Sequence, residues 1–312
     1  MAVAARVDPK TYFTDQEWER LNRRSYWMGP LLVAHCWSVI FAAAAMAVVW
    51  PLTLPLAVAI IGGRQLGLAI LMHDAAHRAL HPDPKVNDFL GNWLCNPVLH
   101  RYRPYHLTHH KFAQQDEDPD LVLSAPFPIT RASLRRKLIR DLTGQTFLKQ
   151  RFGVAAAMSH LANHPKNRLA AGLKQQAGLI AGGVVFTALG AYFGYWWAWA
   201  ACWLLPTATW LPMVTRLRNI AEHACVRQGE PDPLRQARTT KANLIERAFI
   251  APYWVNYHCE HHMFMYLPCY RLPAAHRLLR AKGVLPAMEV RRGYLEVLDM
   301  ASSKPAAAAL AA

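Results

Sequence analysis

The chain has 312 residues, of which 53% are hydrophobic, and it carries a formal net charge of +15 at pH 7. The apolar content is sufficient for a large core, and no helix-turn-helix, zinc-finger or RNA-binding signature accompanies the charge, so we expect no nucleic-acid partner. Anionic lipid head groups and an acidic protein partner explain the excess of Lys and Arg more simply.

We expect residues 1–29 to form a cytoplasmic arm ahead of the first membrane span. The stretch from Met1 to Arg24 is polar and charged, so no cleavable signal peptide is expected. Thr14 is followed three residues later by Glu17, which is the pattern of a capping box and predicts a short helix through Arg24. The expected role of this helix is to position the first span.

Two long stretches, residues 25–63 and 175–215, contain no Asp, Glu, Lys or Arg. Because a helix that crosses a bilayer needs about 20 mostly apolar residues, these stretches predict four transmembrane helices in two hairpins. The first hairpin comprises Leu31–Trp50 and Pro51–Met72, and the second lies within Ala177–Thr215. The expected fold is an all-α integral membrane protein with a helical cap on the cytoplasmic side.

The distribution of Lys and Arg predicts the orientation of these hairpins. The turns near Trp50 and between Tyr192 and Trp199 contain no Lys or Arg, whereas the segment from Arg78 to Lys174 contains fifteen. By the positive-inside rule, both termini and this segment lie in the cytoplasm. We therefore expect a protein of the inner or plasma membrane with its active site on the cytoplasmic side.

Eight histidines fall in three clusters on the expected cytoplasmic side. The clusters are His73-Asp74-Ala75-Ala76-His77, His106-Leu107-Thr108-His109-His110 and His258-Cys259-Glu260-His261-His262. Residues three or four apart share one face of a helix, so each cluster directs its imidazoles the same way. Neutral, unpaired imidazoles are costly to bury and protonated ones repel each other, which makes shared metal ions the simplest explanation.

Asn219 and His223 lie one helical turn apart, just after the last predicted span. With His223 the chain offers nine imidazoles, enough for two ions with four or five ligands each, and imidazole suits zinc, copper, iron and nickel. The chain contains no Glu-x-x-His, which disfavours a carboxylate-bridged di-iron bundle, and no His-Glu-x-x-His, the motif of zinc proteases.

Several ionisable residues near the clusters are candidates to orient metal-bound imidazoles. They are Asp74, Asp118, Asp120, Glu222, Glu260 and, nine residues before His73, Arg64. The acidic run after His110 is equally compatible with solvated surface. Arg64 inside a span is either functional or an anchor that pairs with a carboxylate.

The three histidine clusters resemble the boxes of the membrane fatty acid desaturase and hydroxylase superfamily. The boxes are His73-x-x-x-His77, His106-x-x-His109-His110 and His258-x-x-His261-His262, in this order on this hydropathy frame. Further similarities are Asn219-x-x-x-His223, Asp118-Pro119-Asp120 and Asn256-Tyr257. The resemblance extends from about Arg64 to Leu272 and so covers most of the chain.

The resemblance implies a di-iron site that uses dioxygen to break an unactivated C–H bond. By position in the family's pattern, five histidines would bind one iron: His73, His77, His106, His110 and His261. Four others would bind the second iron: His109, His223, His258 and His262. Asn219 would reach this second iron directly or through water.

The expected reaction is the introduction of a double bond into a lipid acyl chain. Loss of a second hydrogen gives an alkene, whereas oxygen rebound gives an alcohol, so a hydroxylase or ketolase acting on a lipid or carotenoid is the alternative. The first box has three intervening residues, as in plastid- and bacterial-type desaturases and in carotenoid ketolases, whereas several acyl desaturases have four. An acyl substrate fits apolar spans that adjoin a basic cytoplasmic surface.

The electrons for this reaction are expected to come from another protein. The chain has no ferredoxin-type cysteine spacing, no dinucleotide-binding glycine fingerprint and no haem module. We expect an acidic ferredoxin or a cytochrome b5-like donor to dock on the basic cytoplasmic surface.

Two other classes of protein are disfavoured. A metal transporter would place its ligands near the bilayer midplane between broken helices, whereas these boxes lie at span ends and in the cytoplasmic segment. A zinc hydrolase has no need of so many histidines. The resulting division of the chain is an arm (1–29), a desaturase-like membrane domain with its cytoplasmic cap (30–272), and a C-terminal cytoplasmic helix and tail (273–312).

Overall fold

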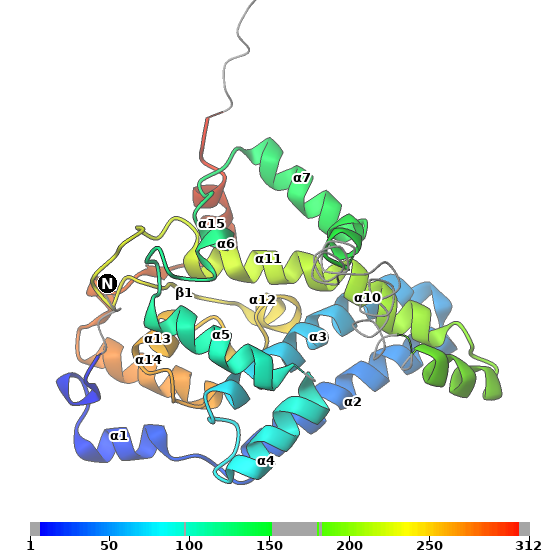
Figure 1. Cartoon of the computed structure of the whole chain (residues 1–312), viewed down its shortest axis with the longest axis horizontal. Coiled ribbons are helices and arrows are strands. Elements are labelled where there is room, and N and C mark those ends of the chain that lie inside the picture. Colours follow the sequence, from blue (N-terminus) through cyan, green and yellow to red (C-terminus); the bar gives the residue numbers. More distant parts are fainter. Residues whose placement is uncertain (1–6, 97, 152–179, 181–182, 306–312) are drawn as a thin grey trace, which may run out of the picture. The chain divides into compact units, whose positions relative to one another are not determined.

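The computed structural model describes residues 7–96, 98–151, 180 and 183–305, and this part of the chain is mostly helical (Figure 1). The chain divides into two compact units. Unit 1 comprises Met1–Ser38, Leu66–Leu134 and Thr215–Ala312, and unit 2 comprises Val39–Gln65 and Arg135–Val214. The expected helical class is confirmed, while the predicted boundaries after residues 29 and 272 stay predictions.

Unit 1 contains many short helices and a two-stranded sheet. Its helices are α1 (Asp15–Asn22), α4 (Pro84–Phe89), α5 (Leu99–Lys111), α6 (Leu121–Ser124), α12 (Leu244–Phe249), α13 (His258–Met263), α14 (Leu272–Ala281) and α15 (Tyr294–Ala301). Shorter turns are η1 (Pro9–Thr11), the π-helical η3 (Leu90–Cys95), η5 (Pro252–Trp254), η6 (Cys269–Arg271) and η7 (Leu285–Ala287). The strands β1 (Thr239–Thr240) and β2 (Val290–Arg291) pair in parallel, with Thr239 opposite Val290. α13 packs against both β1 and α14.

Four longer helices contribute residues to both units. They are α2 (Met28–Val49), α3 (Leu54–Ala76), α7 (Arg131–Leu142) and α11 (Trp210–His223). The turn η2 (Pro51–Thr53) separates α2 from α3. Within unit 1, Gly67 permits a close approach of α3 to η5, because an added Cβ would lie 2.7 Å from a ring carbon of Tyr253.

Local sequence signals account for several helix ends. Thr14 and Glu17 form the expected capping box at the start of α1, which ends at Asn22, two residues before the predicted end. Asp83 caps α4, and its side chain accepts hydrogen bonds from the backbone N–H groups of Lys85 and Val86.

Two helical segments are long and apolar enough to cross a membrane. They are α2 and Pro51–Ala76, which consists of η2 and α3. Two of the four predicted spans therefore correspond to helices of the required length and composition. Part of the second predicted hairpin, residues 177–179 and 181–182, lies outside the described residues. The described part contains a shorter apolar helix, Gly183–Tyr192, so this hairpin stays a prediction.

The rest of the second hairpin is an interrupted helix. It runs through the π-helical η4 (Ala200–Leu204) and α10 (Leu205–Ala208), and breaks at Thr209 before α11. Pro206 and Pro212 explain the irregularity, because each lacks the N–H that an α-helix uses and its ring clashes with the carbonyl four residues earlier. Within unit 2, Gln65 on α3 donates hydrogen bonds to the Trp203 carbonyl (3.0 Å) and to Thr207 Oγ1 (2.8 Å).

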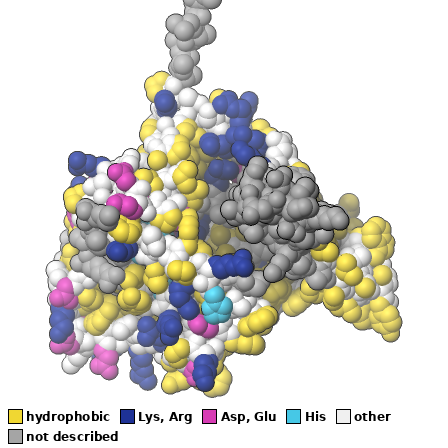
Figure 2. All heavy atoms as spheres, in the orientation of Figure 1, with side chains coloured by type: hydrophobic (Ala, Val, Ile, Leu, Met, Phe, Trp, Pro, Cys, Tyr) yellow, Lys and Arg dark blue, Asp and Glu magenta, His cyan; other side chains and the backbone are white. Residues whose placement is uncertain are grey.

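Large hydrophobic side chains remain exposed on unit 2. They include Phe41, Val49, Trp50, Leu52, Val184, Val185, Phe186, Leu189, Tyr192 and Phe193. Figure 2 shows such side chains gathered over the Gly183–Tyr192 helix and the turn that follows it. Exposed apolar surface of this extent is typical of a surface that contacts lipid or another protein.

Candidate metal centre

The nine histidines lie together in unit 1 although they come from four separate segments. They form two groups of candidate ligands. The first group is His73, His77, His106, His110 and His261, and the second is His109, His223, His258 and His262; within each group the facing atoms lie within 4.8 Å of one another. The ends of α3 and α11 and the helices α5 and α13 supply these side chains.

The first group converges on the Nε2 atom of His110. This atom lies 3.0 Å from Nε2 of His106 and 3.0 Å from Nε2 of His261. The rings of His73 and His77 complete the group, and neither of their ring nitrogens has a hydrogen-bond partner although both are buried. Such orphaned buried polar atoms are rare in folded proteins and indicate a missing ligand.

The second group converges in the same way on Nε2 of His258. This atom lies 3.0 Å from Nε2 of His223 and 3.1 Å from Nε2 of His262. The two groups are adjacent, because the rings of His110 and His262 stack with their centroids 4.3 Å apart.

A proton cannot satisfy either group, whereas a metal ion can. A neutral imidazole carries one N–H, so one hydrogen bond satisfies one pair of nitrogens, and the third nitrogen at each convergence point is left with an unpaired lone pair. A cation at the centre accepts all the lone pairs at once. Borderline divalent metals such as iron or zinc prefer imidazole nitrogen, so the residues present fit metal binding.

Burial keeps the imidazoles in the form that binds metal. Burial, together with the neighbouring charges of His109 and Arg103, lowers the pKa of His77 to about 3. Burial, and then neighbouring imidazoles, likewise lower the pKa of His106, His110, His223, His258, His261 and His262. These rings are therefore neutral at pH 7, with a free lone pair on each.

The first box lies at the end of α3, and side chains hold this end by donating to its last carbonyl groups, which have no partner within the helix. The Ala75 carbonyl accepts hydrogen bonds from Asn87 Nδ2 (2.9 Å) and from Arg103 Nη2 (3.0 Å). The Ala76 carbonyl accepts one from Arg103 Nε (3.0 Å). Asp88 forms an ion pair with Arg103 and so orients it. Three side-chain hydrogen bonds thus hold the chain segment that carries His73 and His77.

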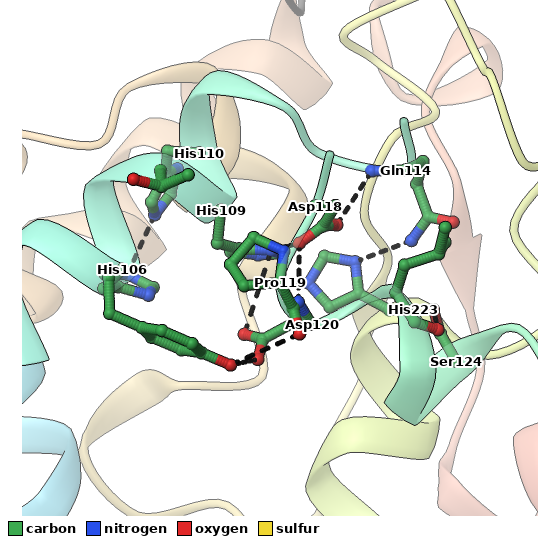
Figure 3. A network of polar contacts seen from close by, with 12 residues as sticks. His106, His109, His110, Gln114, Asp118, Pro119, Asp120, Ser124 and His223 are labelled. Carbon is green, nitrogen blue, oxygen red and sulfur yellow. Dashed lines mark hydrogen bonds and ion pairs between the residues drawn. The ribbon is translucent and has the colours of Figure 1, made fainter. Parts of the chain in front are cut away.

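Asp118 orients the second box (Figure 3). Nδ1 of His109 lies 2.7 Å from one Asp118 carboxylate oxygen, which makes the ring the donor and leaves its Nε2 for a metal ion. The same carboxylate accepts the backbone N–H groups of Gln114 (3.0 Å) and Asp120 (2.9 Å). Asp120 lies farther from the ring, with an oxygen 3.8 Å from His109 Nδ1, and accepts a hydrogen bond from Tyr105.

The remaining predicted orienting residues have different neighbours. Asp74 accepts the backbone N–H of Cys269 (2.8 Å), and Glu260 accepts hydrogen bonds from Thr239 and from His276 Nδ1 (2.5 Å). Both therefore hold segments around the boxes, and the other oxygen of Asp74 lies 4.0 Å from Nδ1 of His73. Arg64 belongs to unit 2, whereas the histidine groups belong to unit 1.

Glu222 lies directly beside the second histidine group. Arg218 Nε donates to one of its oxygens (2.6 Å), and the other oxygen lies 3.5 Å from Nε2 of His258. Burial raises the pKa of Glu222 to about 7, and Arg218 opposes this shift.

Two cavities of unit 1 adjoin the histidines. The smaller, of about 40 Å³, is lined by Tyr102, His106, His109, Asp120, Leu123, Ser124, Arg218, Asn219, Glu222, His223 and His258. The larger, of about 220 Å³, is lined by Val7, Pro9, Trp18, His110, Gln236, His262, Met263, Phe264, Met265 and Tyr266. The larger cavity thus adjoins one histidine of each group.

Sequence reasoning missed three residues of this site. Gln114, three residues beyond the end of α5, places its amide nitrogen 3.3 Å from His223 Nδ1, and no helical spacing indicated it. Tyr102 stacks on His106 with the ring centroids 5.0 Å apart, and their spacing of four residues within α5 could have indicated this contact. His276 lies outside every cluster in the sequence, and no local signal pointed to its contact with Glu260.

Comparison with known proteins agrees with this geometry. A family model described as fatty acid desaturase matches residues 48–293, a range that contains all nine histidines. The chain is also 26% identical over 272 residues to the dihydrorhizobitoxine desaturase of Bradyrhizobium elkanii, an alignment that covers 80% of this chain and 75% of that protein.

Proposed function

Because the chain belongs to the fatty acid desaturase family, we propose that it is a membrane-bound, dioxygen-dependent oxidoreductase that introduces a double bond into a lipid acyl chain. One observation carries this proposal: nine imidazoles, buried or half-buried, converge as two adjacent donor sets in unit 1. The named activity of the Bradyrhizobium relative supports desaturation. That relative is named for dihydrorhizobitoxine, so the support for an acyl substrate comes from the family match.

We propose that each histidine group holds one iron ion. His73, His77, His106, His110 and His261 would hold one, and His109, His223, His258 and His262 the other. Bound iron would supply the activation of dioxygen that an unactivated C–H bond requires. In the balanced reaction, two adjacent methylene groups lose one hydrogen atom each, and dioxygen with two electrons and two protons gives two water molecules.

The protein's own part in this chemistry is to place and hold the donors. Asp118 keeps the proton of His109 on Nδ1. Asn87 and Arg103 fix the end of α3. Because the site is buried, it excludes bulk water and so strengthens every electrostatic interaction within it.

We propose that the cavity of about 220 Å³ receives the reacting segment of the substrate. It adjoins His110 and His262, one histidine of each set, and Met263, Phe264 and Met265 give it an apolar wall. Ligand pockets are usually about 300–1,000 Å³. A smaller cavity suits a few methylene groups of a chain better than an entire lipid.

Membrane attachment and the electron donor are further parts of the proposal. The segments Met28–Val49 and Pro51–Ala76 would cross the bilayer, with the histidines on the cytoplasmic side. Five basic residues of α7, Arg131, Arg135, Arg136, Lys137 and Arg140, form part of the basic surface (Figure 2). An acidic ferredoxin or a cytochrome b5-like protein would bind such a surface.

The experiment that tests this function is lipid analysis by mass spectrometry of host membranes that contain the chain. The expected product has two hydrogen atoms fewer than its precursor and appears with the wild type. The variants His109→Ala and His261→Ala should insert normally and give no product, while His100→Ala, which changes an exposed histidine of α5, should retain it. A product that gains an oxygen atom would indicate a hydroxylase or ketolase, and full turnover by His109→Ala would contradict the proposed site.

A further inference from the structure

A buried carboxylate faces the second histidine group. Glu222 is on α11, directly before His223, and its exposed fraction is only 4%. One of its oxygens, Oε1, is held by Arg218 Nε at 2.6 Å. The other, Oε2, lies 3.5 Å from Nε2 of His258.

This Nε2 atom is also the convergence point of the second group. It lies 3.0 Å from Nε2 of His223 and 3.1 Å from Nε2 of His262. Ligands bound to one ion at about 2.1 Å, with angles of roughly 90 to 110° between them, lie about 3.0 to 3.4 Å apart. The separation between Glu222 Oε2 and His258 Nε2 is close to that range.

Electrostatics gives the same indication. A metal-binding Nε2 carries a lone pair and no proton, so it cannot donate a hydrogen bond to Glu222. A cation between Oε2 and these nitrogens would satisfy their lone pairs together and would favour the charged form of the carboxylate. Arg218 cannot do this, because its Nε is directed at the other carboxylate oxygen.

We propose that Glu222 is a ligand of the second metal ion, which it binds through Oε2. This inference rests on the proposed two-metal site. The second set then consists of four imidazoles and one carboxylate, whereas the first consists of imidazoles alone. The two ions are therefore inequivalent, because the anionic oxygen stabilises the more highly charged state of the ion that it binds.

Arg218 has a positioning role in this arrangement. By holding Oε1, it fixes the rotation of the carboxylate, so that Oε2 faces the histidines. Asn219, the residue indicated by the family resemblance, lines the adjoining cavity of about 40 Å³ together with Glu222. That volume admits a water molecule, through which Asn219 would reach the ion, while the carboxylate would bind it directly.

The test uses Co²⁺ as the probe, with the full-length chain purified in detergent and freed of metal. Bound Co²⁺ is counted by elemental analysis, and its ligands are read from visible and X-ray absorption spectra. We expect two ions on the wild type, and Glu222→Gln to bind the second at least tenfold more weakly, with a spectrum that lacks one oxygen ligand. Activity does not enter this measurement.

Two further variants separate ligation from folding. Glu296→Gln removes the carboxylate of another Arg–Glu pair, formed with Arg291 at the surface, and should leave both ions and the spectrum unchanged. The double variant Arg218→Gln/Glu222→Gln avoids an unpaired buried guanidinium and should show the same loss as Glu222→Gln.

The outcomes are distinguishable. The assignment of Glu222 is wrong, and the two-metal site stands, if the wild type binds two ions and Glu222→Gln binds both with unchanged affinity and spectrum. If Glu222→Gln does not fold, the double variant takes its place in this comparison. If the wild type binds fewer than two ions, both this inference and the proposed function fail.

Discussion

At the scale of single residues, the direction of each imidazole depends on what its second nitrogen contacts. His109 is the clearest case, because Asp118 accepts the proton of Nδ1 and is itself held by two backbone N–H groups. An uncharged amide in place of this carboxylate would bind the ring less firmly and would not favour one tautomer.

We therefore expect Asp118→Asn to weaken metal binding at the second histidine group by about 10- to 100-fold, with the helical content unchanged. Metal titration with circular dichroism measures both quantities. Asp116→Asn is the matched control, since Asp116 is an exposed carboxylate two residues away that pairs with Gln228. Equal affinities for Asp118→Asn and the wild type would show that the Asp118 contact is incidental.

The chemistry of the site was predictable at this scale, but its detailed contacts were not. Spacings of three and four residues placed imidazoles such as His106 and His110 on one face, because the helix period is fixed. The contact between His276 and Glu260 was not predictable, because it joins segments that are distant in the sequence and neither residue shows a pattern of its own.

At the scale of elements, the end of α3 determines where the first box lies. Arg103 donates to the carbonyls of Ala75 and Ala76, and the Ala75 carbonyl also accepts from Asn87 and from the backbone N–H of Arg78. Each buried carbonyl left without a donor costs about 1–3 kcal/mol.

We expect Arg103→Met to destabilise the folded chain by about 2–5 kcal/mol, because it removes donors to two carbonyls and the partner of Asp88. Thermal unfolding of the detergent-solubilised protein, followed by scattering or fluorescence, measures the change. Arg131→Met, at an exposed pair with Asp299, should shift the transition by less than 1 °C or so. Similar transitions for the two variants would contradict the role given to Arg103.

The N-terminal arm has a larger role than its sequence predicted. The capping box of α1 was predictable, but the sequence indicated only a positioning role for this helix. In the structure, Trp18 of α1 lines the cavity beside His110 and His262 and lies against Phe264, with ring centroids 5.7 Å apart. Trp18 therefore limits the volume of this cavity.

We expect Trp18→Ala to extend the range of substrates toward longer or bulkier chain segments, since removal of the indole enlarges the cavity. Product profiles from host membranes supplied with chains of increasing length measure this change. Trp27→Ala, at an exposed tryptophan outside the cavity, is the control and should keep the wild-type profile. A Trp18→Ala profile identical to that of the wild type would place the substrate elsewhere.

At the scale of the whole molecule, composition predicted the helical class and the first two long apolar helices. It did not predict how the second hairpin is interrupted, because hydropathy counts apolar residues and is insensitive to Pro206 and Pro212, which break the regular hydrogen bonding. The cost of burying unpaired imidazoles predicted that the nine histidines come together around metal ions, but their division into two groups was predictable only from the family resemblance.

The excess of positive charge leads to a prediction about electron transfer. Reduction of the chain by an acidic donor should slow by roughly tenfold or more between low and high salt, because screening removes the electrostatic attraction between the partners. Stopped-flow measurements over a range of ionic strength test this, with Arg135→Glu/Lys137→Glu on α7 as the variant expected to lose the dependence. A rate independent of salt would contradict docking on this basic surface.

The proposed site holds two metal ions side by side, one in each histidine group. The most direct measurement is the anomalous scattering of iron in crystals of the iron-loaded protein. Two peaks are expected, one bonded to nitrogens of His73, His77, His106, His110 and His261 and the other to nitrogens of His109, His223, His258 and His262. A single peak, or a peak outside these two groups, would contradict the two-metal site.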